Sequence, residues 1–319
     1  MSKRFDFVKA EQRSPLWHEI RKTGITATNA AVIAGLSPYQ TPYQLWLYKT
    51  GRASEPEAGD AAKRGIILED AVARYYELET KRKLRKSNGI VRLKGERSWV
   101  MASLDRTVIG DPNLIVEVKT SASPRWSMGA PDEVQAQVQW QLLCTGAAAC
   151  DVVALLGGLK FTIQRIESNP KYQADLFARC EAWRERHLLN DEQPALDGAD
   201  SKAFEQATAQ SSEEYATADA AIDRIAAHYA ERLYESKLLD QDLANLAIAI
   251  KEAIGDKAGI YSDAGWSASW RANKPSRKVD WQTLAAEEGI SADTINAYTV
   301  ETPGARVFRF KSMEDFQDE

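Results

Sequence analysis

The tetrapeptide Gly110-Asp-Pro-Asn113 separates two short β-prone runs, Thr107-Val108 and Leu114 to Val118. Glycine, proline, asparagine and aspartate in succession favour a reversal of the chain, so the two runs are predicted to form a hairpin. Positions 105 and 117 are equidistant from the centre of this turn and therefore face each other on neighbouring strands. Directly opposed positions bring their Cβ atoms to about 5 Å, which constrains the fold more than any other pattern in the chain.

The two opposed residues are acids, Asp105 and Glu117. Strand alternation places Lys119 on the same side as Glu117, while Val116 and Val118 point to the other side, into a core. Two close carboxylates repel each other unless a positive charge lies between them. Hard divalent cations such as Mg²⁺ take oxygen ligands, and a nearby lysine can orient water and neutralise a phosphate. The residue types fit metal-assisted phosphodiester hydrolysis, but so short a pattern is more often an exposed ion-pair ladder on an ordinary hairpin, and both readings stay open.

Two predicted helices carry further polar candidates. Glu69 follows Gly65 in the helix predicted over residues 61–78, where it would add a third carboxylate, while its neighbour points about 100° away. Gln137 and Gln141 share one face of the helix predicted over residues 131–143, and their amides can bind water or phosphate oxygen without adding charge. The plain alternative for all three is an exposed polar side chain on a helix surface.

Arg21 and Thr28 lie on either side of a predicted helix start. The pattern predicts one helix from Pro15 to about Gly24 and a second from Asn29 to Ala34, capped by Thr28. Helix N-termini and arginine both bind phosphate well, so this segment is a candidate phosphate site.

The order of the predicted elements indicates an α/β fold. Short helices fill the first hundred residues, and β-prone runs then alternate with helices up to about residue 189. We expect one domain over residues 1–195 and a C-terminal extension over residues 196–319. The extension is predicted to be helical over residues 213–254 and then β-prone, with strands near residues 266–271 and 305–310.

Charge is unevenly distributed along the chain. The protein has a net charge of −5, yet residues 1–100 contain 19 Lys and Arg against 11 Asp and Glu. The run Lys81 to Lys86 is the densest basic segment, and its cations Arg82, Lys83, Arg85 and Lys86 are predicted to contact a phosphate backbone. The alternative is a solvated turn.

Composition excludes several classes of protein. With 44% apolar and 27% charged residues, the chain is typical of a packed globular protein and not of a disordered one. No apolar run approaches the roughly 20 residues of a membrane helix, and the N-terminus lacks the apolar core of a secretory signal. Three cysteines without a CxxC pair do not make a disulfide framework. We therefore expect a cytoplasmic protein that does not enter a membrane.

Five sequence blocks occur in an order that resembles the lambda-type phage exonucleases, which are the YqaJ-like viral recombinase family of the PD-(D/E)xK nuclease superfamily. The blocks span about residues 14–170, roughly half of the chain, and are Trp17-His…Arg21…Ile25-Thr-Ala-Thr28, Gly65…Leu68-Glu69, Ser103-Leu-Asp105, Glu117-Val-Lys119 and Ala136-Gln-Val-Gln-Trp140. Leu104 stands before Asp105 in place of the proline that gives the superfamily its name. The region after about residue 200 has no counterpart that we can match.

The resemblance implies a restriction-endonuclease-like core, a central mixed β-sheet flanked by helices. It implies that Asp105, Glu117 and the Val118 carbonyl bind Mg²⁺, with two ions in each site and Mn²⁺ as a substitute, and that Lys119 is the catalytic lysine. Glu69 and Gln137 correspond to residues on helices that support water or the second ion. Arg21 and Thr28 match positions that hold a 5′-phosphate.

The implied activity is that of a 5′→3′ exonuclease that degrades one strand of double-stranded DNA and leaves 3′ single-stranded tails for recombination by strand annealing. The implied partners are DNA ends, two further copies in a homotrimeric ring and a single-strand annealing protein. The implied setting is a bacterial host cell, with a phage or prophage gene. Two alternatives stay open from the residues: a structure- or sequence-specific DNA endonuclease on the same core, and a non-catalytic DNA-binding or assembly protein.

Overall fold

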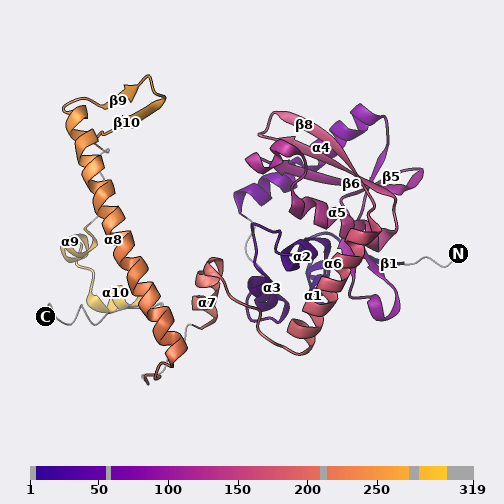
Figure 1. Ribbon diagram of the computed structural model, residues 1–319, viewed down its shortest axis with the longest axis horizontal. Coiled ribbons are helices and arrows are strands. Elements are labelled where there is room, and N and C mark those ends of the chain that lie inside the picture. Colours follow the sequence, from indigo (N-terminus) through magenta and orange to yellow (C-terminus); the bar gives the residue numbers. More distant parts are fainter. Residues whose placement is uncertain (1–4, 55–58, 209–213, 273–279, 300–319) are drawn as a thin grey trace. The chain divides into compact units, whose positions relative to one another are not determined.

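The computed structural model of the protein describes residues 5–54, 59–208, 214–272 and 280–299 (Figure 1). It divides into two compact units, Met1–Thr208 and Ala209–Glu319. The first unit contains all the candidate site residues. The domain boundary expected between residues 195 and 196 stays a prediction.

A five-stranded mixed sheet forms the centre of the first unit. Its strands, in spatial order, are β2 (Leu84–Lys86), β5 (Arg106–Val108), β6 (Asp111–Ser121), β7 (Ala149–Leu156) and β8 (Lys160–Glu167). The β6 and β7 strands are parallel, and every other neighbouring pair is antiparallel. The expected central mixed sheet flanked by helices is confirmed.

Helices cover both faces of this sheet. The helix α4 (Asp60–Thr80) packs Val72 and Tyr76 against the face that carries Val116 and Val118. The opposite face is covered by α5 (Asp132–Thr145), with α2 (Ala27–Ile33) and α6 (Pro170–Trp183) packed behind it (Figure 1). Strand alternation therefore gives β6 one largely apolar face toward α4 and one face on which polar side chains meet α5.

A second, three-stranded antiparallel sheet lies beside the first. Its order is β1 (Phe5–Lys9), β3 (Gly89–Leu93) and β4 (Met101–Ser103). The sequence pattern did not predict β1, because its five residues include one acid and one lysine and only the pairing with β3 orders them.

A close backbone contact joins the junction of the first two helices to β4. A Cβ on Gly24 would lie 2.3 Å from the Trp99 carbonyl oxygen, so no other residue fits without a shift. The next residue, Ile25, donates its N–H to the same carbonyl at 2.7 Å and accepts from the Met101 N–H at 3.1 Å. This contact carries α1 (Pro15–Lys22) and α2 to the strand that leads into Asp105.

The start of α2 differs from the expectation. Thr26, not Thr28, is the N-cap, and it forms a capping box with Asn29. The N-cap was misplaced because three threonine or asparagine residues compete within four positions, and the Gly24 contact with Trp99 starts the helix two residues earlier. Thr28 lies in the first turn of α2 and is exposed.

The remaining helical segments of the first unit are short or extend longer helices. They are α3 (Pro42–Lys49), η1 (Gly95–Arg97), η2 (Pro124–Met128), the π-helical extension η3 of α6 (Arg184–Leu189), η4 (Gly198–Asp200) and α7 (Ser201–Ala207). Thr41 caps α3, and its side chain also donates a hydrogen bond to Asp200, which is buried in η4.

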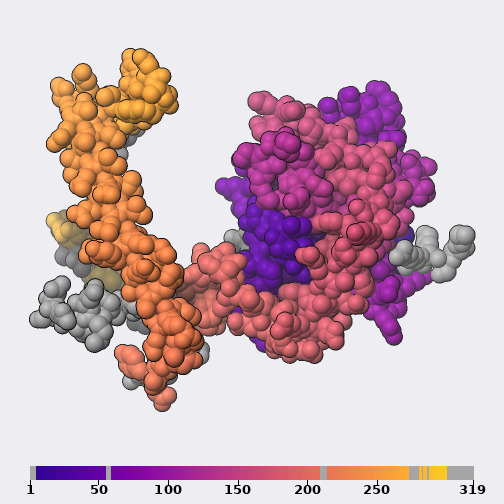
Figure 2. Space-filling model, in the orientation of Figure 1, coloured from indigo at the N-terminus to yellow at the C-terminus, as the bar shows by residue number. Residues whose placement is uncertain are grey.

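The second unit contains a single long helix, α8 (Ala220–Ile254), capped by Asp219. Its side chains form one extended rod in the space-filling view, and Ile254 is the one buried residue along it (Figure 2). A hairpin of β9 (Gly259–Ser262) and β10 (Trp266–Ser269) follows, and then α9 (Trp281–Glu287) and α10 (Ala292–Ala297). The expected strand near residues 305–310 lies outside the described residues.

Among the described residues, no helix has both the length and the apolar character that crossing a membrane requires.

Candidate active site

The β5–β6 hairpin has the expected pairing near the acids, but the turn predicted over Gly110–Asn113 is wrong. Val108 pairs with Asp111, so the turn is Ile109–Gly110 and residues 111–113 belong to β6. An irregularity of the register between Thr107 and Val108 offsets this difference. Arg106 pairs with Val116 and Thr107 with Ile115, so the next pair along the strands is Asp105 and Glu117. The backbone N–H of Val118 donates to Asp105 Oδ2 at 2.9 Å, which fixes that carboxylate against β6. The two acids thus lie close together on the face of the sheet that α5 covers.

Glu117 is 3% exposed and its carboxylate has three donors. Gln137 Nε2 donates to Oε1 at 2.5 Å and Gln141 Nε2 donates to Oε2 at 2.7 Å, from consecutive turns of α5. Lys119 Nζ lies 2.7 Å from Oε1. A buried carboxylate is tolerated when its oxygens are paired in this way.

Lys119 Nζ also donates to Gln137 Oε1 at 2.9 Å, so that Lys119, Glu117 and Gln137 form a closed triangle. Burial lowers the pKa of Lys119, but the Glu117 and Asp105 carboxylates outweigh it and hold this pKa above the ordinary value. The lysine is therefore an ammonium group at neutral pH, a donor and a positive charge, and not a free base.

Burial and the Glu117 carboxylate raise the pKa of Asp105 to about 8, against an ordinary value of 3.8. Lys119 and the Val118 N–H act in the opposite direction without cancelling this effect. In the metal-free protein a proton on Asp105 is therefore favoured near neutral pH.

These residues fit a hard divalent cation. No three His, Cys, Asp or Glu side chains gather into a ready-made metal cluster in the described part of the chain. The donor set consists instead of two carboxylates with amide oxygens beside them, one of which, Gln141 Oε1, is buried without a hydrogen-bond partner. A cation between Asp105 and Glu117 would replace the proton that their repulsion retains, and Mg²⁺ commonly binds one or two carboxylates together with water and phosphate.

Glu69 reaches the same place from α4, but through an arginine that the sequence pattern did not indicate. Arg106 Nη1 donates to Glu69 Oε1 at 2.6 Å, and Arg106 Nη2 donates to the Asp70 carboxylate. Lys86 Nζ lies 3.8 Å from Glu69, and Arg13 lies 3.9 Å from it. The side chains of Glu69 and Asp70 leave α4 in different directions, as expected, and the Arg106 guanidinium donates a hydrogen bond to each carboxylate.

A cavity of about 190 Å³ opens beside these residues. Its lining includes Glu69, Asp105 and Gln137 together with Arg21 and Thr28, whereas Glu117 and Lys119 are not part of it. The predicted phosphate-binding residues and three of the predicted catalytic or metal-binding residues therefore border one cleft.

Trp17 supports Arg21 in this cleft. The Arg21 guanidinium carbon lies 4.1 Å from the centre of the Trp17 ring, and Trp17 Nε1–H donates to Ser103 Oγ at 3.1 Å. Ser103 is the last residue of β4 and stands two residues before Asp105, so this hydrogen bond connects α1 to the strand that precedes Asp105. The sequence pattern did not indicate the Trp17 to Ser103 contact, because it depends on the approach of α1 to β4.

The basic run Lys81 to Lys86 divides between two places. Lys86 lies at the site, near Glu69, whereas Arg82 Nη1 lies 3.6 Å from the buried Asp151. Lys83 and Arg85 are exposed. The contact of these four cations with DNA stays a prediction.

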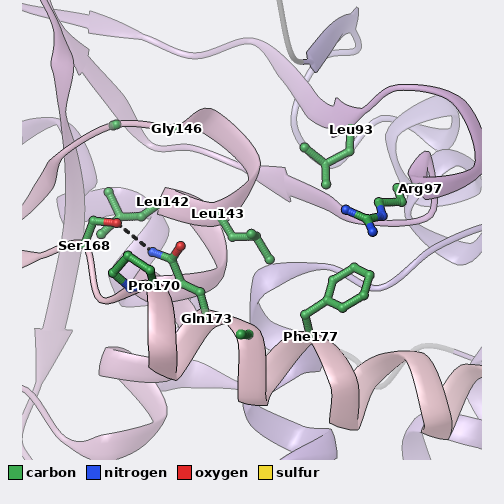
Figure 3. Close-up of a pocket in the computed structure, with 11 residues that line it drawn as sticks. Leu93, Arg97, Leu142, Leu143, Gly146, Ser168, Pro170, Gln173 and Phe177 are labelled. Atoms are coloured by element: carbon green, nitrogen blue, oxygen red, sulfur yellow. Dashed lines mark hydrogen bonds between the residues drawn. The ribbon is translucent and has the colours of Figure 1, made fainter.

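A larger cavity of about 440 Å³ lies between α5, α6 and η1 (Figure 3). Leu142, Leu143 and Phe177 form its apolar wall, and the Arg97 guanidinium carbon lies 5.2 Å from the centre of the Phe177 ring. No candidate site residue lines this cavity, so it is separate from the acids.

The raised pKa of Asp105 makes stability depend on pH. Between the ordinary value of 3.8 and about 8, folded Asp105 keeps a proton that the unfolded chain has released, so the free energy of unfolding falls as pH rises. Asp105→Asn removes this term. In metal-free protein at about pH 9, the substitution should raise the Tm of the first unit by roughly 2–4 °C, equivalent to about 1 kcal/mol. The gain should vanish at about pH 4. A lower Tm of the variant at the higher pH, measured by calorimetry, would contradict the assignment.

Comparison with known proteins identifies the family of the chain. The sequence pattern of the YqaJ-like viral recombinase domain matches residues 16–148, which include β5, β6, α4 and α5. The uncharacterized protein YqaJ of Bacillus subtilis (strain 168) is 32% identical to this chain over 246 residues, which is 74% of each chain.

Two solved structures are similar to the chain. An alkaline exonuclease (LHK-Exo) from Laribacter hongkongensis has 21% sequence identity and a TM-score of 0.46, and the match covers 56% of this chain and 94% of that one. A putative exonuclease from Eubacterium rectale has 14% identity and a TM-score of 0.43, and the match covers 66% and 97% of the two chains. Because the Bacillus relative is 32% identical over 74% of its length, the chain belongs to the YqaJ-like viral recombinase family.

Proposed function

We propose that this protein is a Mg²⁺-dependent 5′→3′ exonuclease that degrades one strand of double-stranded DNA. The observation that carries the proposal is the convergence of Asp105, Glu117 and Lys119 on one face of the sheet, where Asp105 lines a cleft. Membership of a viral recombinase family, together with similar structures named as exonucleases, supports the same reading. The product would be 3′ single-stranded tails for recombination by strand annealing.

Asp105, Glu117 and the Val118 carbonyl would hold the metal, with two Mg²⁺ ions in each site and Mn²⁺ as a substitute. When bound, the ion would act as a Lewis acid on the scissile phosphate. The amides of Gln137 and Gln141 keep the Glu117 carboxylate in one orientation, so that it needs little rearrangement to act as a ligand.

Lys119 would act as a cation beside the reacting phosphate. Because neighbouring carboxylates keep it protonated, its expected role is to donate hydrogen bonds to water or phosphate oxygen and to offset the negative charge that develops there. Gln137 fixes the ammonium group at 2.9 Å and would position it for that role.

Arg21 and Thr28 would bind the terminal 5′-phosphate in the same cleft. A guanidinium stacked on Trp17 is held in a limited set of orientations, and the hydroxyl of Thr28 lies in the first turn of α2, where helix N–H groups attract anions. Arg82, Lys83, Arg85 and Lys86 would contact the phosphate backbone of the duplex.

The proposed assembly is a homotrimeric ring that works beside a single-strand annealing protein in the cytoplasm of a bacterial host. Residues 1–195 would form the exonuclease domain, and the role of residues 196–319 stays open.

Lys119→Ala tests the proposed chemistry. The variant should lower the rate of digestion of a 5′-labelled duplex with Mg²⁺ by about 10²–10³-fold, because the ammonium acts mainly in the transition state. Its affinity for the same duplex, measured by fluorescence anisotropy in EDTA, should stay within about threefold of wild type. Lys160→Ala, at an exposed lysine on β8, is the matched control and should digest at the wild-type rate.

The same assay separates the alternative functions. An exonuclease leaves closed circular plasmid intact, releases the labelled 5′ terminus first and requires the divalent ion. Cleavage of the circle would favour an endonuclease. Binding without any digestion by wild-type protein in Mg²⁺ or Mn²⁺ would favour a non-catalytic DNA-binding protein.

Arg21→Ala tests the phosphate site. Wild-type protein should digest 5′-phosphorylated ends faster than 5′-hydroxyl ends, and the variant should reduce this ratio by about tenfold or more, the loss expected for one charge-assisted hydrogen bond. Lys22→Ala, at the adjacent exposed cation, should keep the wild-type ratio. An unchanged ratio of the two digestion rates in Arg21→Ala would show that Arg21 does not bind the 5′-phosphate.

A further inference from the structure

We propose that Arg106 is a positioning residue that holds the Glu69 carboxylate beside Asp105 for hydrolysis. The inference rests on the proposed nuclease function and extends it to a residue that was not among the candidate site residues. It follows from how one guanidinium connects the hairpin of the acids with α4.

Strand alternation sends Arg106 to the α4 face of the sheet. Asp105 faces the cleft, and the next residue, paired with Val116, points to the opposite side. The Arg106 side chain is 5% exposed. Its Nη1 donates both to Glu69 Oε1 at 2.6 Å and to the Asp105 carbonyl oxygen at 2.9 Å. One nitrogen therefore joins the backbone of Asp105 to the side chain of Glu69.

The two carboxylates that Arg106 binds differ in their surroundings. The Glu69 side chain is 12% exposed and lines the cleft with Asp105, whereas the Asp70 side chain is 79% exposed and does not line it. An exposed ion pair contributes little to stability, so the bond to Asp70 is expected to have a small effect. The bond to Glu69 is the one that lies at the site.

Glu69 needs a positive partner to stay near Asp105. Both side chains line the same cleft, and two ionised carboxylates at that range repel each other. Lys86 at 3.8 Å and Arg13 at 3.9 Å are about half exposed, and solvent screens their attraction. Arg106 is the close and buried partner, and its planar fork fixes the direction of the carboxylate in a way that a lysine cannot.

Arg106 would affect the reaction by fixing the orientation of the Glu69 carboxylate. A carboxylate that supports water or a second cation acts only from a fixed place, and a displacement of about 1 Å can cost about 10²-fold in rate. Loss of the guanidinium should therefore have the same effect on hydrolysis as loss of Glu69 itself.

A double-mutant cycle tests this inference in the full-length protein. Arg106→Gln, Glu69→Gln and the double variant are compared in single-turnover digestion of a 5′-phosphorylated duplex with Mg²⁺. Each single variant should lower the maximal rate by about 10- to 100-fold, and the double variant should be no slower than Glu69→Gln. The half-saturating duplex concentration, and the affinity for duplex in EDTA, should stay within about threefold of wild type.

Two further variants keep the test decisive. Asp70→Asn removes the ion pair between Arg106 and Asp70, and its maximal rate should stay within about twofold of wild type. Arg106→Lys keeps the positive charge and can therefore be tested if Arg106→Gln does not fold. Its maximal rate should still be at least about fivefold below that of wild type, because a lysine lacks the planar fork of arginine. Thermal unfolding of every variant shows which ones are folded.

Three outcomes would overturn the proposal: a wild-type rate for both Arg106 variants, a double variant whose loss is the product of the single losses, or an equal loss in Asp70→Asn. These outcomes leave the proposed nuclease function intact. Absence of digestion by the wild-type protein would instead remove both the nuclease function and the role of Arg106.

Discussion

Two carboxylates at opposed positions of one hairpin create a repulsion that the surrounding structure has to compensate. Glu117 lies within β6, and Asp105 directly precedes β5 and accepts a hydrogen bond from the Val118 N–H, so the hairpin holds the two acids close together. The compensation comes from two glutamines of α5, one ammonium group of β6 and the N–H of Val118. It is incomplete, because the pKa of Asp105 stays near 8. In the proposed function a cation between the two carboxylates would relieve this repulsion, so the opposed positions of the two acids underlie the proposed chemistry.

The layers of the fold divide the tasks around this pair. The apolar side chains of β6 bind the hairpin to α4, and the polar side chains of the same strand meet α5, so alternation alone separates core from site. The contact between Gly24 and Trp99 brings α1 and α2 to β4, which places Arg21 and Thr28 in the lining of the cleft. Arg106, the first residue of β5, connects the two faces of the sheet, because it donates hydrogen bonds both to the Asp105 carbonyl oxygen and to Glu69 of α4.

The hairpin and the opposition of residues 105 and 117 could be predicted from the sequence, because the period of a strand determines which residues share a face. The turn was misplaced by about two residues, because local composition does not reveal the irregularity between Thr107 and Val108. Other features depend on tertiary contacts that local patterns do not encode. Arg106 reaches Glu69 only because α4 crosses the opposite face of the sheet, and Gln141 meets Glu117 only because α5 lies against β6. The β1 strand is ordered by its pairing with β3. The N-cap of α2 is Thr26 and not the predicted Thr28, because the contact of Gly24 with Trp99 sets where the helix begins. A run of like charges likewise does not reveal its partners, and Arg82 and Lys86 lie near different acids.

The central claim is that Asp105 and Glu117 together hold a divalent cation, and the most direct measurement is metal binding without DNA. Titration of the metal-free protein with Mn²⁺, followed by the EPR signal of the free ion, reports this binding independently of hydrolysis. The account predicts that wild-type protein binds Mn²⁺ and that Glu117→Gln weakens the affinity by at least about tenfold. The same affinity in wild-type and Glu117→Gln protein would contradict it.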